Sequence, residues 1–220
     1  MAFAWGETLP ALPAARVRLR HLTVADAEDV FAIFSDPEVT RYWSTGPMAA
    51  VAEAAAYIEG IHAALRRRDL FQWGVEQNDS GRIVGTCTLL NLSAAHQRAE
   101  IGFAVARAFW GRGLARETAA AAAAFAFEQL ELHRLEADVD PRNERSLRLL
   151  EGLGFRREGI LRERYLISGE RQDALMLGLL RIEWAAARGD DAGRDARREV
   201  AMPASRRDGH GHPAAATPNS

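Results

Sequence analysis

The sequence predicts an α+β fold, in which about seven strands form one mixed sheet and about four helices pack on it. Two observations favour this class. Hairpins with clear turn signals flank the middle of the chain, and a central strand, glycine turn and helix are followed directly by another strand. The length of 220 residues suits one domain with appendages, and a core of that size folds without disulfides.

The N-terminal segments predict one strand and two helices. Residues 16–22 alternate apolar and basic side chains, as expected for a strand near a sheet edge. Thr23 and Asp26 have the spacing of a capping box, so we expect a helix from Thr23 to Asp36-Pro37. Residues 49–68 predict a second helix, which ends in three arginines at the negative end of its dipole.

The later segments predict two hairpins around one long helix. Asn78-Asp79-Ser80-Gly81 is a strong turn signal between the first two of these strands, and Ser168-Gly169 separates the last two. The predicted strands are residues 71–76, 82–92, 99–105, 134–139, 155–167 and 172–180, and the predicted helices are residues 116–130 and 143–153.

The two ends of the chain are predicted to lie outside the domain. We expect an N-terminal extension over residues 1–13, the domain over residues 14–185 and a tail over residues 186–220. The tail has almost no large apolar side chains, so it is expected to be disordered. His210 and His212 stand in this tail without rigid support, and we expect no metal there.

Composition and charge exclude several classes of protein. All 28 basic residues are arginine, so a Walker-type phosphate loop and a Schiff-base lysine are excluded. The single cysteine, Cys87, excludes a disulfide framework and is expected to be an inert core thiol. A net charge of −2 gives no basic field for nucleic acid or an anionic membrane. Without an apolar run of about 20 residues or a signal peptide, we expect a soluble, cytoplasmic protein.

The turn over residues 110–115 is the sharpest chemical signal. Gly111 and Gly113 let the backbone approach an anion closely, and the amides of residues 112–116 lie free at a helix N-terminus. These features predict a pyrophosphate cradle, with a tight turn that holds no ligand as the alternative. A dinucleotide-binding Rossmann loop is disfavoured, because it would need a third glycine where Arg116 stands.

Four motifs in order resemble the GNAT superfamily of acetyl-CoA-dependent N-acetyltransferases over residues 14–185. They are Glu100-Ile-Gly-Phe-Ala-Val105, Trp110-Gly-Arg-Gly-Leu-Ala115, Asn143-Glu-Arg-Ser146 and Leu150-Glu-Gly-Leu-Gly-Phe155. Within the superfamily the chain is most similar to the Rim type (RimJ and RimL), which acetylate the N-terminal amines of ribosomal proteins. The resemblance implies a mostly antiparallel sheet in three α/β/α layers, acetyl-CoA as cosubstrate and no metal.

The resemblance also implies a set of residues that bind coenzyme A. The glycine turn would hold the pyrophosphate through its backbone, although Trp110 departs from the Gln or Arg that is usual at its entry. The strand before the turn would splay from its neighbour and bind the pantetheine arm through its amides. The expected cofactor contacts are Phe103, Val105, Trp110, Gly111, Arg112, Gly113, Leu114, Ala115, Arg116, Asn143 and Arg148. A solvated helix face is the alternative for each of these arginines, and a plain helix N-cap is the alternative for Asn143.

Three further residues are candidates for catalysis and acceptor binding. Amine attack on a thioester needs a neutral amine, and Glu100 is expected to take its proton directly or through a water. In the Rim-type resemblance, Ser146 hydrogen-bonds the leaving thiolate; a helix serine bonded to its own backbone is the alternative. Many superfamily members have a tyrosine that acts as general acid seven residues after the asparagine, but Leu150 stands at that position here. Tyr165 is a candidate for shaping the acceptor site.

These residues predict transfer of acetyl from acetyl-CoA to a primary amine. The favoured acceptor is a protein N-terminal amine of the ribosomal-protein-alanine type. Two alternatives stay open: a small-molecule N-acetyltransferase that acts on a polyamine, amino sugar or antibiotic, and a non-catalytic acyl-CoA-binding module. We expect no direct nucleic-acid partner and no membrane, and either a monomer or a homodimer.

Overall fold

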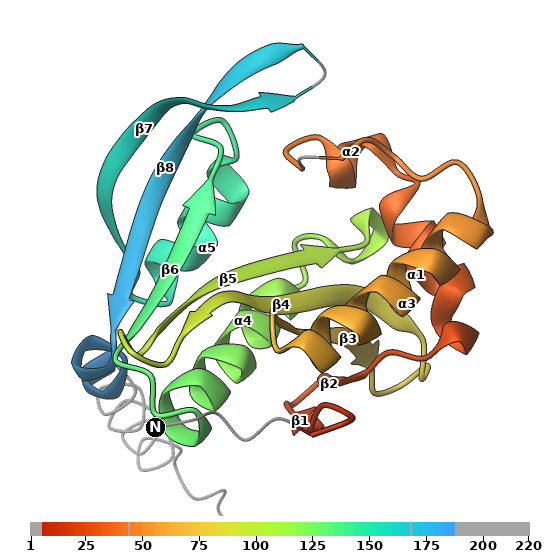
Figure 1. Ribbon diagram of the computed structural model, residues 1–220, viewed down its shortest axis with the longest axis horizontal. Coiled ribbons are helices and arrows are strands. Elements are labelled where there is room, and N and C mark those ends of the chain that lie inside the picture. The colour runs from red at the N-terminus through yellow and green to blue at the C-terminus, as the bar shows by residue number, and fades with distance from the viewer. Residues whose placement is uncertain (1–5, 44, 168, 188–220) are drawn as a thin grey trace, which may run out of the picture.

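A computed structural model describes residues 6–43, 45–167 and 169–187, and its centre is one eight-stranded sheet (Figure 1). The strand order is β1-β2-β3-β4-β5-β6-β8-β7. All neighbouring strands are antiparallel except β5 and β6. The strands are β1 Leu12–Pro13, β2 Val17–His21, β3 Phe71–Gln77, β4 Ile83–Ser93, β5 Arg98–Val105, β6 Arg134–Val139, β7 Arg156–Ile167 and β8 Glu170–Leu180.

Helices cover both faces of this sheet. The α-helices are α1 Ala27–Phe34, α2 Pro37–Thr40, α3 Val51–Arg67, α4 Leu114–Ala124 and α5 Glu144–Gly152. Helices α1 and α3 build one hydrophobic core with Leu22, Ile83 and Ala104. Helices α4 and α5 build the other core with the opposite face of the strands. The predicted α+β class and its α/β/α layers are therefore confirmed.

The differences from prediction are local. Strand β1 is an eighth strand, and it lies within the segment that we expected to be an extension. Its two residues, one of them a proline, give no periodic signal. Helix α4 begins at Leu114 instead of residue 116 and passes into a π-helical turn over Phe125–Gln129. Residues 181–187 add a helical segment, whereas residues 188–220 of the predicted tail, with His210 and His212, lie outside the described residues.

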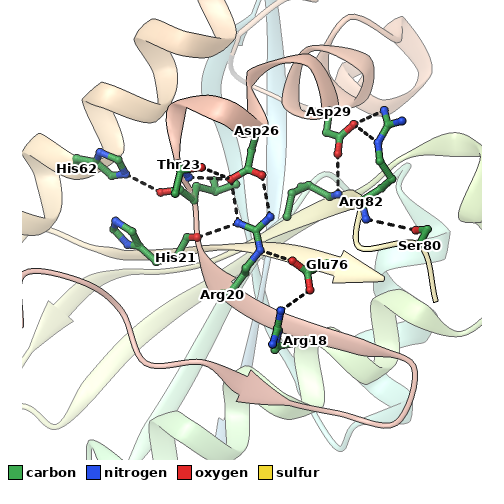
Figure 2. A network of polar contacts seen from close by, with 12 residues as sticks. Arg18, Arg20, His21, Thr23, Asp26, Asp29, His62, Glu76, Ser80 and Arg82 are labelled. Atoms are coloured by element: carbon green, nitrogen blue, oxygen red, sulfur yellow. Dashed lines mark hydrogen bonds and ion pairs between the residues drawn. The ribbon is translucent and has the colours of Figure 1, made fainter. Parts of the chain in front are cut away.

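A network of charged side chains ties β2 to the start of α1 and to β3 (Figure 2). The Arg20 guanidinium donates two hydrogen bonds to Asp26, at 2.9 and 2.7 Å, and one to the carboxylate of Glu76. Arg18 donates to the other oxygen of Glu76 at 2.6 Å. Asp26 also accepts from the Thr23 N–H at 2.8 Å, which is the expected return bond of the capping box. This region fixes the N-terminal layer on the sheet.

The central β5-α4-β6 unit positions the residues of interest. Strands β5 and β6 pair only from Arg98 opposite Arg134 to Glu100 opposite Glu136. Beyond Glu100, β5 pairs with β4 alone, and beyond Glu136, β6 pairs with β8 alone. Figure 1 shows the two strands starting side by side and then diverging. In the described part of the chain, no helix has the length and apolar character needed to cross a membrane.

Candidate active site

The divergence of β5 and β6 leaves backbone groups of β5 without a strand partner. Ala106 donates its N–H to the Val84 carbonyl at 2.8 Å, which sets the alternation along the β4/β5 ladder. By that alternation, the amides of Ala104 and Gly102 face β4, and those of Val105 and Phe103 face the gap toward β6. Both residues predicted to bind pantetheine therefore present their amides where an extended ligand could add as a further strand.

The glycine turn follows directly on this strand. Gly111 and Gly113 have φ of +73° and +77°, a backbone conformation that other residues adopt only with strain. Gly113 is the N-cap of α4, so the amides of Leu114, Ala115 and Arg116 have no acceptor within the helix. The Leu114 side chain is buried in the core, which leaves its amide as the group available to a ligand. An anion cradle at this turn stays a prediction, and backbone amides are the groups that would form it.

A clamp at the start of β2 holds the turn in place, formed by Arg16 just before the strand and by its first residue, Val17. Arg16 donates to the Arg112 carbonyl at 2.8 Å and forms an ion pair with Glu117 at 3.0 Å. The Glu117 carboxylate also accepts the Val17 N–H at 3.2 Å. A Cβ atom on Gly113 would approach the Arg16 guanidinium at 3.2 Å, so the clamp and the turn are closely fitted. Sequence reasoning missed this clamp, because its partners lie about one hundred positions apart.

Trp110 closes the end of the splayed strand. Its indole N–H donates to the Val105 carbonyl at 2.7 Å, and its ring packs against the core of α1 and α3. The Arg145 guanidinium lies over the ring, 4.6 Å from the centroid. Trp110 is therefore a structural link between the end of β5, the entry of the turn and the start of α5.

The predicted phosphate-binding arginines lie in different surroundings. Arg112 lies over the Phe109 ring, 5.3 Å from its centroid. Arg116 donates to the Gly152 carbonyl at 3.3 Å and so joins α4 to the end of α5. Arg148 forms an exposed ion pair with Glu144 at 2.9 Å, one helical turn away. All three are exposed, which is compatible with phosphate contact and with the solvated alternative.

Asn143 and Ser146 meet at the start of α5. The Asn143 side-chain oxygen accepts the Ser146 N–H at 3.2 Å, so the helix N-cap alternative for Asn143 describes that oxygen correctly. The amide nitrogen of the same side chain remains available for a ligand. The half-buried Ser146 hydroxyl makes no hydrogen bond with another described residue. The described residues therefore do not show the bond to its own helix backbone that the alternative for Ser146 expects.

Glu100 lies at the last paired position before the strands diverge. Burial raises the pKa of its carboxyl above the usual value, and the hydrogen bond from the Asn91 side chain, at 2.9 Å, opposes that shift. The negative charge of Asp138 adds to the raised pKa, whereas Arg164 opposes it. A carboxylate in this setting is a stronger base than one in water. It has no ion-pair partner among the described residues.

A second polar group lies on the other arm of the divergence. Tyr165 donates its hydroxyl to the Asp138 carboxylate at 2.6 Å, and Arg164 forms an ion pair with the same carboxylate at 2.8 Å. Burial and the bond to Asp138 raise the pKa of Tyr165. Asp138 is on β6, and the other two residues are on β7, so this group joins the sheet to its edge hairpin.

Sequence reasoning did not single out Asn91, Asp138, Arg145 or Arg164. Asp138 had a detectable signal, since Leu135, Ala137 and Val139 are buried and Asp138 alternates with them. Asn91 has φ of +52° at an irregular point of the β4/β5 ladder, which no local pattern marks. Cys87 is buried, and burial raises the pKa of its thiol to about 12, which agrees with the predicted inert role.

Comparisons with known proteins find an acetyltransferase domain and similar acetyltransferases. Residues 16–156 match the model of the acetyltransferase (GNAT) domain. An uncharacterized N-acetyltransferase, YoaA of Bacillus subtilis (strain 168), is 34% identical over 172 residues, which cover 78% of this chain and 97% of the relative. A spermidine N(1)-acetyltransferase of Escherichia coli (strain K12) is 29% identical over 171 residues, covering 77% and 89%. Mycobacterium smegmatis RimJ in complex with CoA-disulfide superposes with a TM-score of 0.70 at 27% identity, covering 82% of this chain and 93% of that one.

Proposed function

The chain belongs to the GNAT acetyltransferase family, and from that premise we propose that it transfers acetyl from acetyl-CoA to the N-terminal amine of a protein or peptide. The observation that carries this proposal is the divergence of β5 and β6 beyond Glu100, with the glycine turn at the end of β5. That arrangement offers unpaired amides for an extended arm and a backbone cradle for two phosphates.

The residues of the chain divide the chemistry between them. The amides of residues 111–116 bind the diphosphate, and the amides of Phe103 and Val105 bind the pantetheine arm. A backbone amide of the splayed strand polarises the thioester carbonyl, so that charge developing on its oxygen is stabilised. The Nδ2 group of Asn143 is placed at the start of α5 to orient the arm. Positioning and oxyanion stabilisation would supply most of the acceleration.

Two side chains assist the transfer of the acetyl group. The amine nitrogen bonds to the carbonyl carbon, and Glu100 takes the amine proton directly or through a water. The carbon–sulfur bond then breaks, and the Ser146 hydroxyl donates a hydrogen bond to the departing thiolate. The unpartnered Ser146 hydroxyl and the raised pKa of Glu100 support these roles. Tyr165 contributes to the wall of the acceptor site.

The charges around the divergence favour an acceptor with a single positive charge. Glu136 is paired with Arg98 and Arg134, at 2.7 and 2.9 Å, and Asp138 is paired with Arg164. Asp140 is paired with Arg142 at 2.6 Å. Within the described ranges, Glu100 is the one of these four carboxylates that has no arginine partner. A polyamine would call for several free carboxylates, whereas a peptide N-terminus needs one.

The first experiment is calorimetric titration with acetyl-CoA. We expect binding near the micromolar range, about −8 kcal/mol, and its loss in Gly113→Glu, because the new side chain strains a positive φ and puts an anion in the cradle. The matched control is Gly60→Glu on α3, where the space around the glycine is open. A folded wild-type protein without affinity for acetyl-CoA would overturn the proposal.

The second experiment tests the acceptor. Release of the coenzyme A thiol is followed with peptides that carry free or blocked N-termini, and with spermidine, since a spermidine acetyltransferase is among the relatives. Turnover of the free peptides and not of spermidine is expected. Turnover of spermidine alone would replace the protein acceptor with a small polyamine, and tight binding without any turnover would favour the non-catalytic module.

A further inference from the structure

Arg145 has an unusual position in this site. It is the second residue of α5, it is exposed, and its guanidinium lies 4.6 Å from the centre of the Trp110 ring. A guanidinium over an indole face is held by attraction to the π-electrons, which leaves its N–H donors free at their edges. Because Trp110 immediately precedes Gly111, this contact keeps the positive charge at the entry of the glycine turn.

Other arginines near the turn are already engaged. Arg16 is paired with Glu117, Arg107 with Asp36 at 3.3 Å, and Arg148 with Glu144. Arg116 donates to a carbonyl. Arg145 makes no ion pair and no hydrogen bond with another residue in the described ranges. Like Arg112, it therefore keeps a positive charge that no carboxylate of the described chain neutralises.

The location of Arg145 also has an electrostatic cost. A cation in the first turn of a helix faces the positive end of the helix dipole, which favours acidic residues there. Glu144, its neighbour in the same turn, follows that preference, but its charge is directed to Arg148. A residue that opposes a local rule without a compensating partner is a sign of function. An anion at the turn would supply the missing partner.

We infer that Arg145, held on the face of Trp110, binds the diphosphate of coenzyme A at the entry of the glycine turn. This inference rests on the proposed function. It gives Trp110 two tasks: the indole N–H fixes the Val105 carbonyl, and the ring face presents the cation. It also explains how a turn with an apolar residue at its entry gains a charged side chain at that position, which comes from α5 and adds to Arg112 of the turn itself.

Calorimetric titration of Arg145→Gln with acetyl-CoA and with acetyl-dephospho-CoA, which lacks only the 3′-phosphate, tests this inference. We expect the dissociation constant to rise about tenfold or more for both ligands, because a charge-assisted hydrogen bond to the diphosphate is lost. Arg67→Gln is the control, because it makes the same change of charge at the C-terminal end of α3, outside the proposed site. This variant should bind both ligands as the wild type does. A loss restricted to acetyl-CoA would place Arg145 on the 3′-phosphate and overturn the assignment.

Thermal melting separates a binding role from a structural one. The midpoint of Arg145→Gln should equal or slightly exceed that of the wild type, because the unfavourable charge at the helix start is removed. A lowered midpoint together with weaker binding would overturn the inference. If the wild type binds acetyl-CoA and Gly113→Glu does not, unchanged affinity in Arg145→Gln rejects this inference alone and leaves the proposed function intact.

A double-mutant cycle tests the role of the ring. Trp110→Leu removes the indole face, so Arg145→Gln should weaken acetyl-CoA binding much less in that background than in the wild type. Additive losses would show that the two side chains act independently, and the holding role of Trp110 would then be rejected.

Discussion

Two polar regions of this molecule use the same residue types in opposite ways. Around Arg20, the guanidinium and the carboxylates of Asp26 and Glu76 satisfy one another, and the two carboxylates are only 11% and 12% exposed (Figure 2). Burial opposes ionisation there, but the hydrogen bonds from Arg20 hold the pKa of both carboxyls below their usual values. At the divergence of β5 and β6, by contrast, Glu100 and Arg145 have no ion-pair partner in the part of the chain that the structure describes, and the Ser146 hydroxyl has no hydrogen-bond partner there.

This contrast distinguishes polar side chains that stabilise the fold from polar side chains that are placed to bind a ligand. A network whose charges are paired internally stabilises the fold and leaves no unpaired charge, donor or acceptor for a ligand. A group of polar side chains that is left unbalanced has to be stabilised by its surroundings, and it becomes complete only when a ligand arrives. Changes in the two regions should therefore have opposite signatures, one on stability and one on activity.

The largest expected effect is on activity, in Glu100→Gln. We expect kcat/KM to fall by about 10²–10⁴-fold, since the proton acceptor is lost, with unchanged affinity for acetyl-CoA. The thermal midpoint should be unchanged or higher, because burial disfavours the charged carboxylate. The fall of kcat/KM toward acid pH, which reports protonation of the Glu100 carboxylate, should also disappear.

Glu136→Gln is the control for this variant, because Glu136 lies opposite Glu100 in the β5/β6 register. Its carboxylate is bound by Arg98 and Arg134, so its loss should lower stability. The acid limb of the pH profile should persist but move slightly to lower pH, because the charge of Glu136 contributes to the raised pKa of Glu100. Equal losses of activity in the two variants would contradict the distinction between the regions.

The next effect is on stability, in Arg20→Met. Removal of the guanidinium leaves Asp26 without its ion-pair partner, and we expect a loss of about 2–3 kcal/mol in the free energy of unfolding. Affinity for acetyl-CoA should be retained. Chemical denaturation measures the loss, and Arg82→Met provides the comparison, since Arg82 is exposed and its pair with Asp29 should contribute far less. A loss of the same size in Arg82→Met would show that closure of the network is unimportant.

The sequence predicts the backbone of the site much better than its side-chain environment. Gly111 and Gly113 are recognisable because positive φ requires glycine, and Asn143 because a helix start requires a cap. The contacts Asn91 to Glu100, Tyr165 to Asp138 and Arg145 to Trp110 join separate elements. Only the tertiary arrangement brings these pairs together. For the same reason β1, which is formed by pairing and not by periodicity, was missed.

A smaller effect is expected in Ser146→Ala. The hydroxyl has no partner in the described chain, so its removal should leave the free energy of unfolding unchanged. We expect kcat to fall about tenfold, as one hydrogen bond to the leaving thiolate is lost, and affinity for acetyl-CoA to stay the same. Ser146→Thr should recover part of kcat, because it keeps a hydroxyl. An unaltered kcat in Ser146→Ala would remove this residue from the mechanism.

The smallest expected effect is a pH dependence of stability beside the Arg20 network. His21 stacks on His62 with ring centroids 4.6 Å apart, and burial, His62 and Arg20 together lower the pKa of His21. As the pH falls through about 6.5, the unfolded chain takes up a proton at this position before the folded chain does, so stability decreases. His21→Gln should flatten the decrease measured by denaturation between about pH 7 and pH 5. The acid loss from Asp26 and Glu76, whose pKa values are lowered, begins only near their ordinary values at about pH 4. A decrease that is identical in His21→Gln and the wild type would show that the proton uptake of His21 does not change on folding, and the pH dependence of this region would then come from its carboxylates.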